Sequence, residues 1–107
     1  MILYGVNSTE QRTEWFSQLK KAREMFDDEI DWIEGDEISE DDYVNLISVD
    51  LQEFYKNYNG EYDVEEEMEE FATTVKTCIW DEDWEQGNPR DDGYDFDYYI
   101  SRKVIEY

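Results

Sequence analysis

Carboxylates dominate the side chains of this sequence that could take part in chemistry. The chain has 31 Asp and Glu residues, 9 Lys and Arg residues, no His and one cysteine, Cys78. Paired carboxylates can hydrolyse glycosides, but among so many acids a pair carries almost no information. The missing His removes the commonest general base and metal ligand, and surrounding anions disfavour a Cys78 thiolate. With no glycine-rich phosphate loop or zinc-ligand spacing either, we expect a protein that is not an enzyme and uses no cofactor.

One segment has a superficial likeness to a calcium-binding loop. It runs from Asp81 to Asp92 and contains six acidic residues, four before the Gly-Asn-Pro-Arg sequence and two after it. An EF-hand requires Gly at position 6 and Glu at position 12. Here Gln86 and Asp92 occupy those positions. We therefore predict no metal site.

The acids gather in three segments, 27–42, 61–70 and 81–97. Charge runs are usually solvated faces, but solubility of a small domain needs a net charge of magnitude only about 2–8. The formal charge here is −22, so we expect the acids to bind a basic partner. The predicted partner-binding residues are Asp27, Asp28, Glu29, Asp31, Glu34, Asp36, Glu37, Glu40, Asp41 and Asp42 in the first segment, Glu65, Glu66, Glu67, Glu69 and Glu70 in the second, and Asp81, Asp83, Glu85, Asp91, Asp92, Asp95 and Asp97 in the third.

A size comparison connects this charge to nucleic acid. A compact chain of this length has a diameter of roughly 34 Å. Duplex DNA of that length carries about 20 phosphates, which is close to the net charge of the protein. Carboxylates two apart on a strand, or four apart on a helix, lie about 6–7 Å apart, a spacing similar to that of successive phosphates.

Aromatic residues indicate that the chain folds despite its charge. Four Trp, nine Tyr and five Phe residues make up 17% of the 107 residues, whereas disordered acidic segments are poor in them. We expect one domain over 1–107, of the α+β class, with about three helices packed on a small, mainly antiparallel sheet. Tyr and Trp are also favoured anchors in protein interfaces.

Hydrophobic spacing and capping signals predict the elements that position the acids. Ser8 and Asp63 are candidate helix N-caps, Ser39 with Asp42 resembles a further helix start, and Asn59-Gly60 is a turn signal. The segment 73–80 is β-branched and is left open between helix and strand. The predicted elements are a strand over 1–6, a helix over 9–26, a short strand over 29–34, a helix over 43–58, a helix from 64, a loop over 81–93 and a closing strand over 94–104.

Location and partners follow from the same features. One cysteine permits no internal disulfide, and no signal peptide or membrane span is recognisable, so we expect the cytoplasm, or a host cytoplasm if a phage encodes the chain. Nucleic-acid phosphates and anionic membranes would repel the protein, so we expect no direct binding to either. The partner should be a basic nucleic-acid-binding protein such as a nuclease, restriction enzyme or CRISPR complex. The oligomeric state stays open, a homodimer included.

In general character the chain resembles DNA-mimic inhibitors encoded by phages and mobile elements, such as antirestriction and anti-CRISPR proteins. The acid runs that begin at Asp27 and Glu65, the abundant Tyr and Trp, the small size and the absence of His carry the resemblance. It implies an inhibitor that occupies the DNA-binding groove of a host-defence protein. The alternative is an immunity or antitoxin protein that neutralises one basic nuclease through a localised patch.

Overall fold

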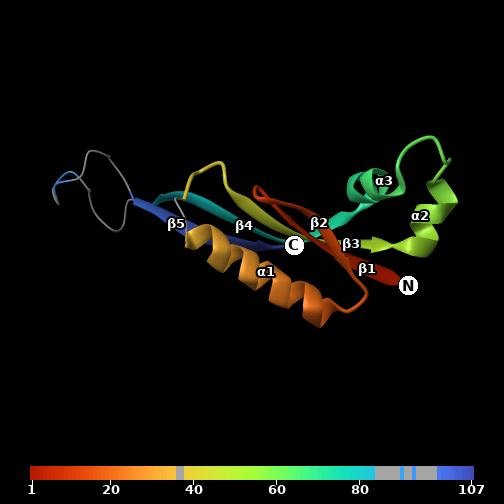
Figure 1. Cartoon of the computed structure of the whole chain (residues 1–107), viewed down its shortest axis with the longest axis horizontal. Helices are drawn as coiled ribbons and strands as arrows, with labels where there is room; N and C mark the ends of the chain where they lie inside the picture. The colour runs from red at the N-terminus through yellow and green to blue at the C-terminus, as the bar shows by residue number, and fades with distance from the viewer. Residues whose placement is uncertain (36–37, 84–89, 91–92, 94–98) are drawn as a thin grey trace.

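A five-stranded antiparallel sheet organises the chain, with strand order β2-β1-β3-β4-β5 and three helices packed on it (Figure 1). The computed structural model describes residues 1–35, 38–83, 90, 93 and 99–107. The predicted α+β class is confirmed. The elements are β1 (Ile2–Ser8), β2 (Gln11–Phe16), α1 (Leu19–Glu34), β3 (Tyr43–Asp50), α2 (Leu51–Asn57), α3 (Val64–Phe71), β4 (Thr73–Asp83) and β5 (Tyr99–Glu106).

The helix predicted over 9–26 is wrong in its first half. Residues 9–10 form a turn, and β2 then pairs antiparallel with β1, so that Trp15 lies opposite Gly5. A methyl group on Gly5 would come within 2.8 Å of Thr13 and 2.9 Å of Trp15, so only glycine allows this close approach. The Ser8 hydroxyl does not cap a helix but accepts a hydrogen bond from the Glu10 N–H at 3.2 Å. Pairing with β1 therefore replaces the helix that local spacing predicts.

The short strand predicted over 29–34 is also wrong, because α1 continues through it to Glu34. Phe26, Ile30 and Ile33 recur at helical spacing and are buried against the sheet. Gly35 follows as the C-cap, and its N–H donates to the Asp31 carbonyl at 2.9 Å. Burial of one continuous apolar stripe outweighs the β-branched character of Ile30 and Ile33.

The helix predicted over 43–58 divides into a strand and a helix. Val44, Leu46 and Val49 are buried within β3, which lies at the centre of the sheet. The helix α2 begins only after Asp50, whose carboxylate accepts from the Gln52 N–H at 3.0 Å. Residues 39–42 start no helix; the Asp42 carboxylate accepts from the Ser39 N–H at 2.9 Å within a turn.

Several other element predictions are confirmed. The strand predicted over 1–6 is β1, α3 begins after the Asp63 cap, and Gly60 has the positive φ (81°) of a turn. The open segment 73–80 is a strand that belongs to β4. The closing strand is β5, although its predicted residues 94–98 lie outside the described residues. The loop predicted over 81–93 is wrong at 81–83, because these residues pair with the first residues of β5 and end β4; loop residues 84–89 and 91–92 lie outside the described residues.

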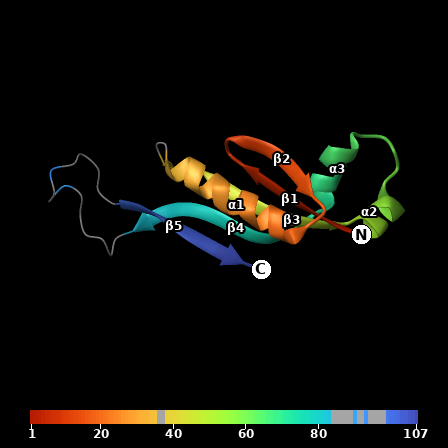
Figure 2. The ribbon, with the colours of Figure 1, turned by 60° about the horizontal axis from the view of Figure 1, so that its bottom comes forward.

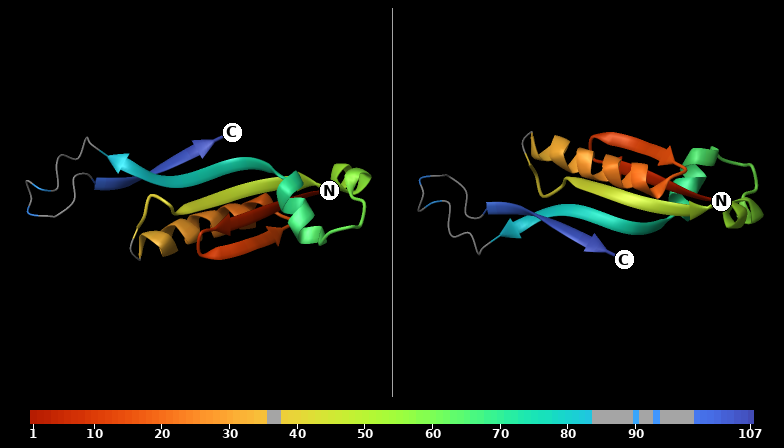
Figure 3. Two further views of the ribbon diagram at one scale, coloured as in Figure 1. Left: turned by 90° about the horizontal axis from the view of Figure 1, so that it is seen from above. Right: turned by 90° about the horizontal axis from the view of Figure 1, so that it is seen from below.

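The two faces of the sheet carry different helices. Side chains of Val6, Val44 and Cys78 pack with α1 in one core cluster, whereas Val49 packs with Phe54 of α2 and Met68 of α3 in a second. Neighbouring positions of a strand point to opposite faces, so these clusters lie on opposite sides of the sheet. Figures 2 and 3 show α1 along one face and α3 at one end of the other.

Candidate functional site

The outer surface of α1 carries the first group of exposed acids. Ala22, Phe26, Ile30 and Ile33 face the sheet, so the positions between them face solvent. Four exposed acids that follow Arg23 along the helix define what we call the α1 acidic surface: Glu24, Asp27, Asp28 and Asp31. Within this set Glu24 precedes Asp28, and Asp27 precedes Asp31, by one helical turn, about 6 Å along the axis.

The charges of α1 are arranged against the preference of the helix dipole. The cations Lys20, Lys21 and Arg23 lie in its first turns, with no acid in the first turn and no base in the last. The partial charges of a helix favour acids at the N-terminus and bases at the C-terminus, by about 0.3–1 kcal/mol each. Acids one turn apart add about 0.2–0.5 kcal/mol of repulsion per pair. The α1 acidic surface therefore costs helix stability.

An exposed tryptophan adjoins this surface. The side chain of Trp32 is 70% exposed, one helical turn after Asp28 and next to Asp31 in sequence. An exposed indole beside carboxylates can receive an Arg guanidinium, which stacks on the ring while its N–H groups donate to the acids. Sequence reasoning missed Trp32 because it placed residues 29–34 in a strand.

Two acids of the first segment are engaged within the fold. Glu29 is only 7% exposed, and its carboxylate accepts a hydrogen bond from the Ser8 hydroxyl at 3.0 Å. Glu34 is half-buried and forms an ion pair with Arg102 of β5 at 3.1 Å. Glu29 was predicted to contact a partner, but its side chain lies between α1 and the sheet, where the carboxylate is not accessible. Glu34 holds β5 to the end of α1.

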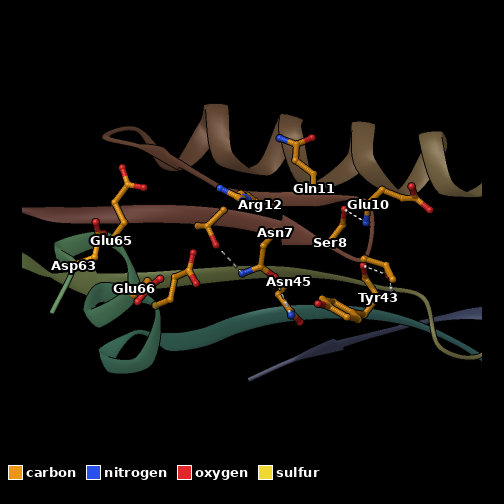
Figure 4. Close-up of a pocket in the computed structure, with 13 residues that line it drawn as sticks. Asn7, Ser8, Glu10, Gln11, Arg12, Tyr43, Asn45, Asp63, Glu65 and Glu66 are labelled. Atoms are coloured by element: carbon orange, nitrogen blue, oxygen red, sulfur yellow. Dashed lines mark hydrogen bonds between the residues drawn. The ribbon is translucent and has the colours of Figure 1, made fainter.

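The second acidic segment rims a cleft on the opposite face of the sheet (Figure 4). The cleft has a volume of about 940 Å³; Glu65, Glu66 and Glu69 of α3 line it, together with Glu10 after β1. The Asp63 carboxylate caps α3 by accepting from the Glu65 N–H at 2.9 Å. Acids in a first helical turn are favoured by the dipole, so those of α3 stabilise their own helix, unlike those of α1. Of the other predicted residues here, Glu70 is exposed and Glu67 is partly buried.

A ladder of polar side chains crosses four strands at the floor of this cleft. The Asn7 amide donates to the Thr13 hydroxyl at 3.1 Å, and the Asn45 amide donates to the Asn7 carbonyl oxygen at 3.1 Å. The Thr77 hydroxyl donates to the Asn45 side-chain oxygen at 2.9 Å. Asn is disfavoured inside strands, so these residues would have stood out had 43–50 been assigned to a strand.

The remaining predicted residues are more scattered. Glu40 and Asp41 are exposed in the turn before β3, and Asp42 is partly buried. Asp81 forms an ion pair with Lys103 at 3.2 Å; its pKa is lowered by the Glu82 N–H, which donates to it, and by Lys103. Asp83 ends β4 and is partly buried. Asp36, Glu37, Glu85, Asp91, Asp92, Asp95 and Asp97 lie outside the described residues.

The two helices that carry the first two groups of acids lie on opposite faces of the sheet, α1 on one and α3 on the other (Figure 3). The α1 acidic surface lies on one side, and the cleft lined by α3 lies on the other. A flat partner can contact one of them at a time, so the two surfaces do not join into a single row. The α1 acidic surface is thus unfavourable for its own helix, whereas the acids in the first turn of α3 are favoured by theirs.

Within residues 1–35, 38–83, 90, 93 and 99–107, no three His, Cys, Asp or Glu side chains are grouped so as to hold a metal ion. No helix in the same ranges has the length and apolar character needed to cross a bilayer. Most of the segment compared with a calcium loop, 84–89 and 91–92, lies outside them.

Comparison of this chain with protein-family models, with curated proteins and with solved structures finds no match.

Proposed function

We propose that this protein is a stoichiometric inhibitor that binds a basic nucleic-acid-binding protein in the place of nucleic acid. The target class is a restriction enzyme, a CRISPR effector or another DNA-binding protein of host defence. The α1 acidic surface is the proposed contact. The surface supplies carboxylates that the Lys and Arg residues of a DNA groove would accept in place of phosphates.

The unfavourable placement of the α1 acids is the observation that carries the proposal. Charge that served only solubility could lie anywhere on the surface, including the first turn of α1, where it would stabilise the helix. Instead the first turns hold Lys20, Lys21 and Arg23, and the acids crowd the second half. A position that costs stability is best explained by a requirement outside the fold.

Dimensions of the scaffold are compatible with this role. The carboxylates of Asp27 and Asp31 project one helical turn apart, about 6 Å. The 11 residues of β4 span about 36 Å, which is roughly one turn of duplex DNA. Packing of α1 on β1, β2 and β3 holds its acids in a defined array, and this reduces the entropy lost on binding.

A second candidate, an immunity or antitoxin protein, has one observation in its favour. The described acids separate onto two faces, and Trp32 stands exposed beside one of them. Such a compact patch with an aromatic anchor is typical of a single hot spot. In that case one cognate nuclease would be blocked through Trp32 and its neighbours.

Competition with duplex DNA tests the proposal. A labelled duplex bound to each of a panel of restriction enzymes and CRISPR effectors is titrated with the protein, and its release is measured by fluorescence anisotropy at rising salt. We expect release from at least one target, weakening steeply with salt because the contacts are ionic. The proposal is lost if no target releases DNA, or if the protein binds a target with undiminished affinity at high salt.

Matched variants assign the contact to one face. Asp27→Lys/Asp28→Lys/Asp31→Lys should weaken inhibition by at least about tenfold. The control Glu65→Lys/Glu66→Lys/Glu69→Lys changes the net charge equally on the opposite face and should weaken it much less. Equal losses would show that overall charge, not the α1 acidic surface, determines binding. Loss of inhibition by Trp32→Ala alone, with little effect of single acid substitutions, would favour the immunity alternative.

A further inference from the structure

The outer edge of β5 is an open edge of the sheet. Among the described residues, β5 pairs with β4 alone, in a register without a bulge (Figure 2). The Tyr107 N–H donates to the Val75 carbonyl at 3.0 Å, so odd-numbered residues here direct their backbone groups toward β4. The N–H and C=O groups of the even-numbered residues, Arg102, Val104 and Glu106 among them, therefore point outward.

This edge lacks the features that usually prevent strand pairing. Proteins protect edges with Pro, bulges or charged side chains. The segment 99–106 contains no Pro, and its three charged side chains are each paired within the chain, Arg102 with Glu34, Lys103 with Asp81, and Glu106 with Lys76 at 3.5 Å. Val104 is 45% exposed and Ile105 is 41% exposed, on opposite faces of the strand. Its charges are Arg102, Lys103 and Glu106, a local balance of +1 in a chain of −22. The β5 edge is thus a part of the surface where a second copy meets little repulsion.

We propose that two copies of this chain pair through β5, antiparallel, with the two-fold axis at Val104, to form one continuous sheet. In this register Val104 lies opposite Val104 of the second copy. Arg102 lies opposite Glu106 of the second copy, and the same pair repeats across the axis. About six backbone hydrogen bonds join the outward-pointing groups. Ile105 packs against the aliphatic stem of Lys103 of the second copy, so both exposed apolar side chains become covered.

Charge favours this register over those centred at Arg102 or Lys103. An axis at Arg102 would set Arg102 against its own copy, and an axis at Lys103 would set Lys103 against its own copy; both place like charges directly opposite. An axis at Val104 gives two pairs of opposite charge. Arg102 already contacts Glu34 at 3.1 Å, and its guanidinium has further N–H groups for a second carboxylate.

The dimer goes beyond the proposed function and does not depend on it. A two-fold axis between antiparallel edge strands stands perpendicular to the sheet, so both α1 helices lie on the same face. The two α1 acidic surfaces would then face one target together, at either side of the axis. The dimer would thus present two α1 acidic surfaces on one face of the sheet, whereas a single chain presents one there.

Analytical ultracentrifugation with native mass spectrometry tests the dimer. We expect twice the 13.0 kDa of one chain at micromolar concentration, more completely at 0.5 M salt, because salt screens repulsion between two chains of −22. Val104→Pro removes an outward N–H and no bond to β4, so it should raise the dimer dissociation constant at least about tenfold. Val104→Thr keeps the N–H and serves as control, and circular dichroism verifies the fold of both.

Charge exchange tests the register. Glu106→Arg alone and Arg102→Glu alone should each weaken self-association, because each sets like charges opposite one another. A mixture of the two variants should restore a heterodimer, since every Arg then meets a Glu. A monomeric wild type at high concentration and salt, an unaffected dimer of Val104→Pro, or no heterodimer in the mixture would overturn the proposal. Dimerisation strengthens with salt and inhibition weakens with it, so failure of either idea is recognised separately.

Discussion

Reversing one charge in α1 should stabilise the protein, although it lies on the proposed binding surface. Asp31 occupies the last turn of α1, one turn after Asp27. Asp31→Lys converts the Asp27 repulsion into an attraction, worth about 0.4–1 kcal/mol in total. It also replaces an unfavourable interaction with the helix dipole by a favourable one. At an exposed position each of these interactions is worth about 0.3 kcal/mol, so the replacement contributes about 0.6 kcal/mol. We expect the free energy of unfolding to rise by about 1–2 kcal/mol.

The control is Glu65→Lys in the first turn of α3, which changes the net charge by the same two units, from −22 to −20. There the dipole favours the acid, so the substitution loses about 0.6 kcal/mol or more. Conversion of the repulsion from Glu69 into an attraction returns about 0.4–1 kcal/mol, so we expect a net change in the free energy of unfolding close to zero. Urea and thermal unfolding measure both variants, at about 4–8 °C per kcal/mol for a domain near this size.

A gain for Asp31→Lys without a comparable gain for Glu65→Lys would show that the local helix environment, not total charge, governs stability. If both variants gain stability to the same extent, repulsion across the whole molecule dominates, and the argument that the α1 acids are held at a local cost fails. Low salt sharpens the comparison because the exposed charges are then least screened.

Two further predictions concern buried groups. Ser8→Ala removes the donor to the buried Glu29 carboxylate and should lower the free energy of unfolding by about 2–3 kcal/mol, measured by urea denaturation. Replacing Glu29 by Met in the Ser8→Ala variant should recover part of that loss. If stability does not recover, the loss does not come from the buried Glu29 carboxylate left without its donor. Burial raises the pKa of the Cys78 thiol from 9.0 to about 11, so this thiol deprotonates at a lower pH in the unfolded chain than in the folded one. The free energy of unfolding should therefore fall between pH 9 and pH 11 by up to about 1.4 kcal/mol per pH unit; Cys78→Ala should lack this component in unfolding measured over that range.

Local signals in the sequence were sufficient for the charge distribution, the α+β class and several element boundaries. Asp63 caps α3, Gly60 turns the chain, and β1 lies where an apolar run predicts a strand. Each of these features depends on residues that are neighbours in sequence. A cap needs one carboxylate and a backbone N–H two residues away, and no distant element has to be in place.

Tertiary structure decided the assignments that failed. Residues 11–16 and 43–50 contain apolar residues at spacings that suit a helix, but their backbones pair with β1, and Gly5 admits Trp15 at close range. Those partners are supplied by other parts of the chain, so local periodicity could not identify them.

Accessibility of the acids was decided in the same way. Thirty-one acidic side chains and their clustering can be counted from the sequence, but not which of them reach solvent. The side chain of Glu29 faces the sheet, where Ser8, 21 residues earlier in the chain, donates a hydrogen bond to it. The side chains of Asp27 and Asp28, beside it in sequence, are exposed. Composition determines how much charge the chain carries; only the packing of a helix on a particular sheet determines the direction in which each carboxylate points.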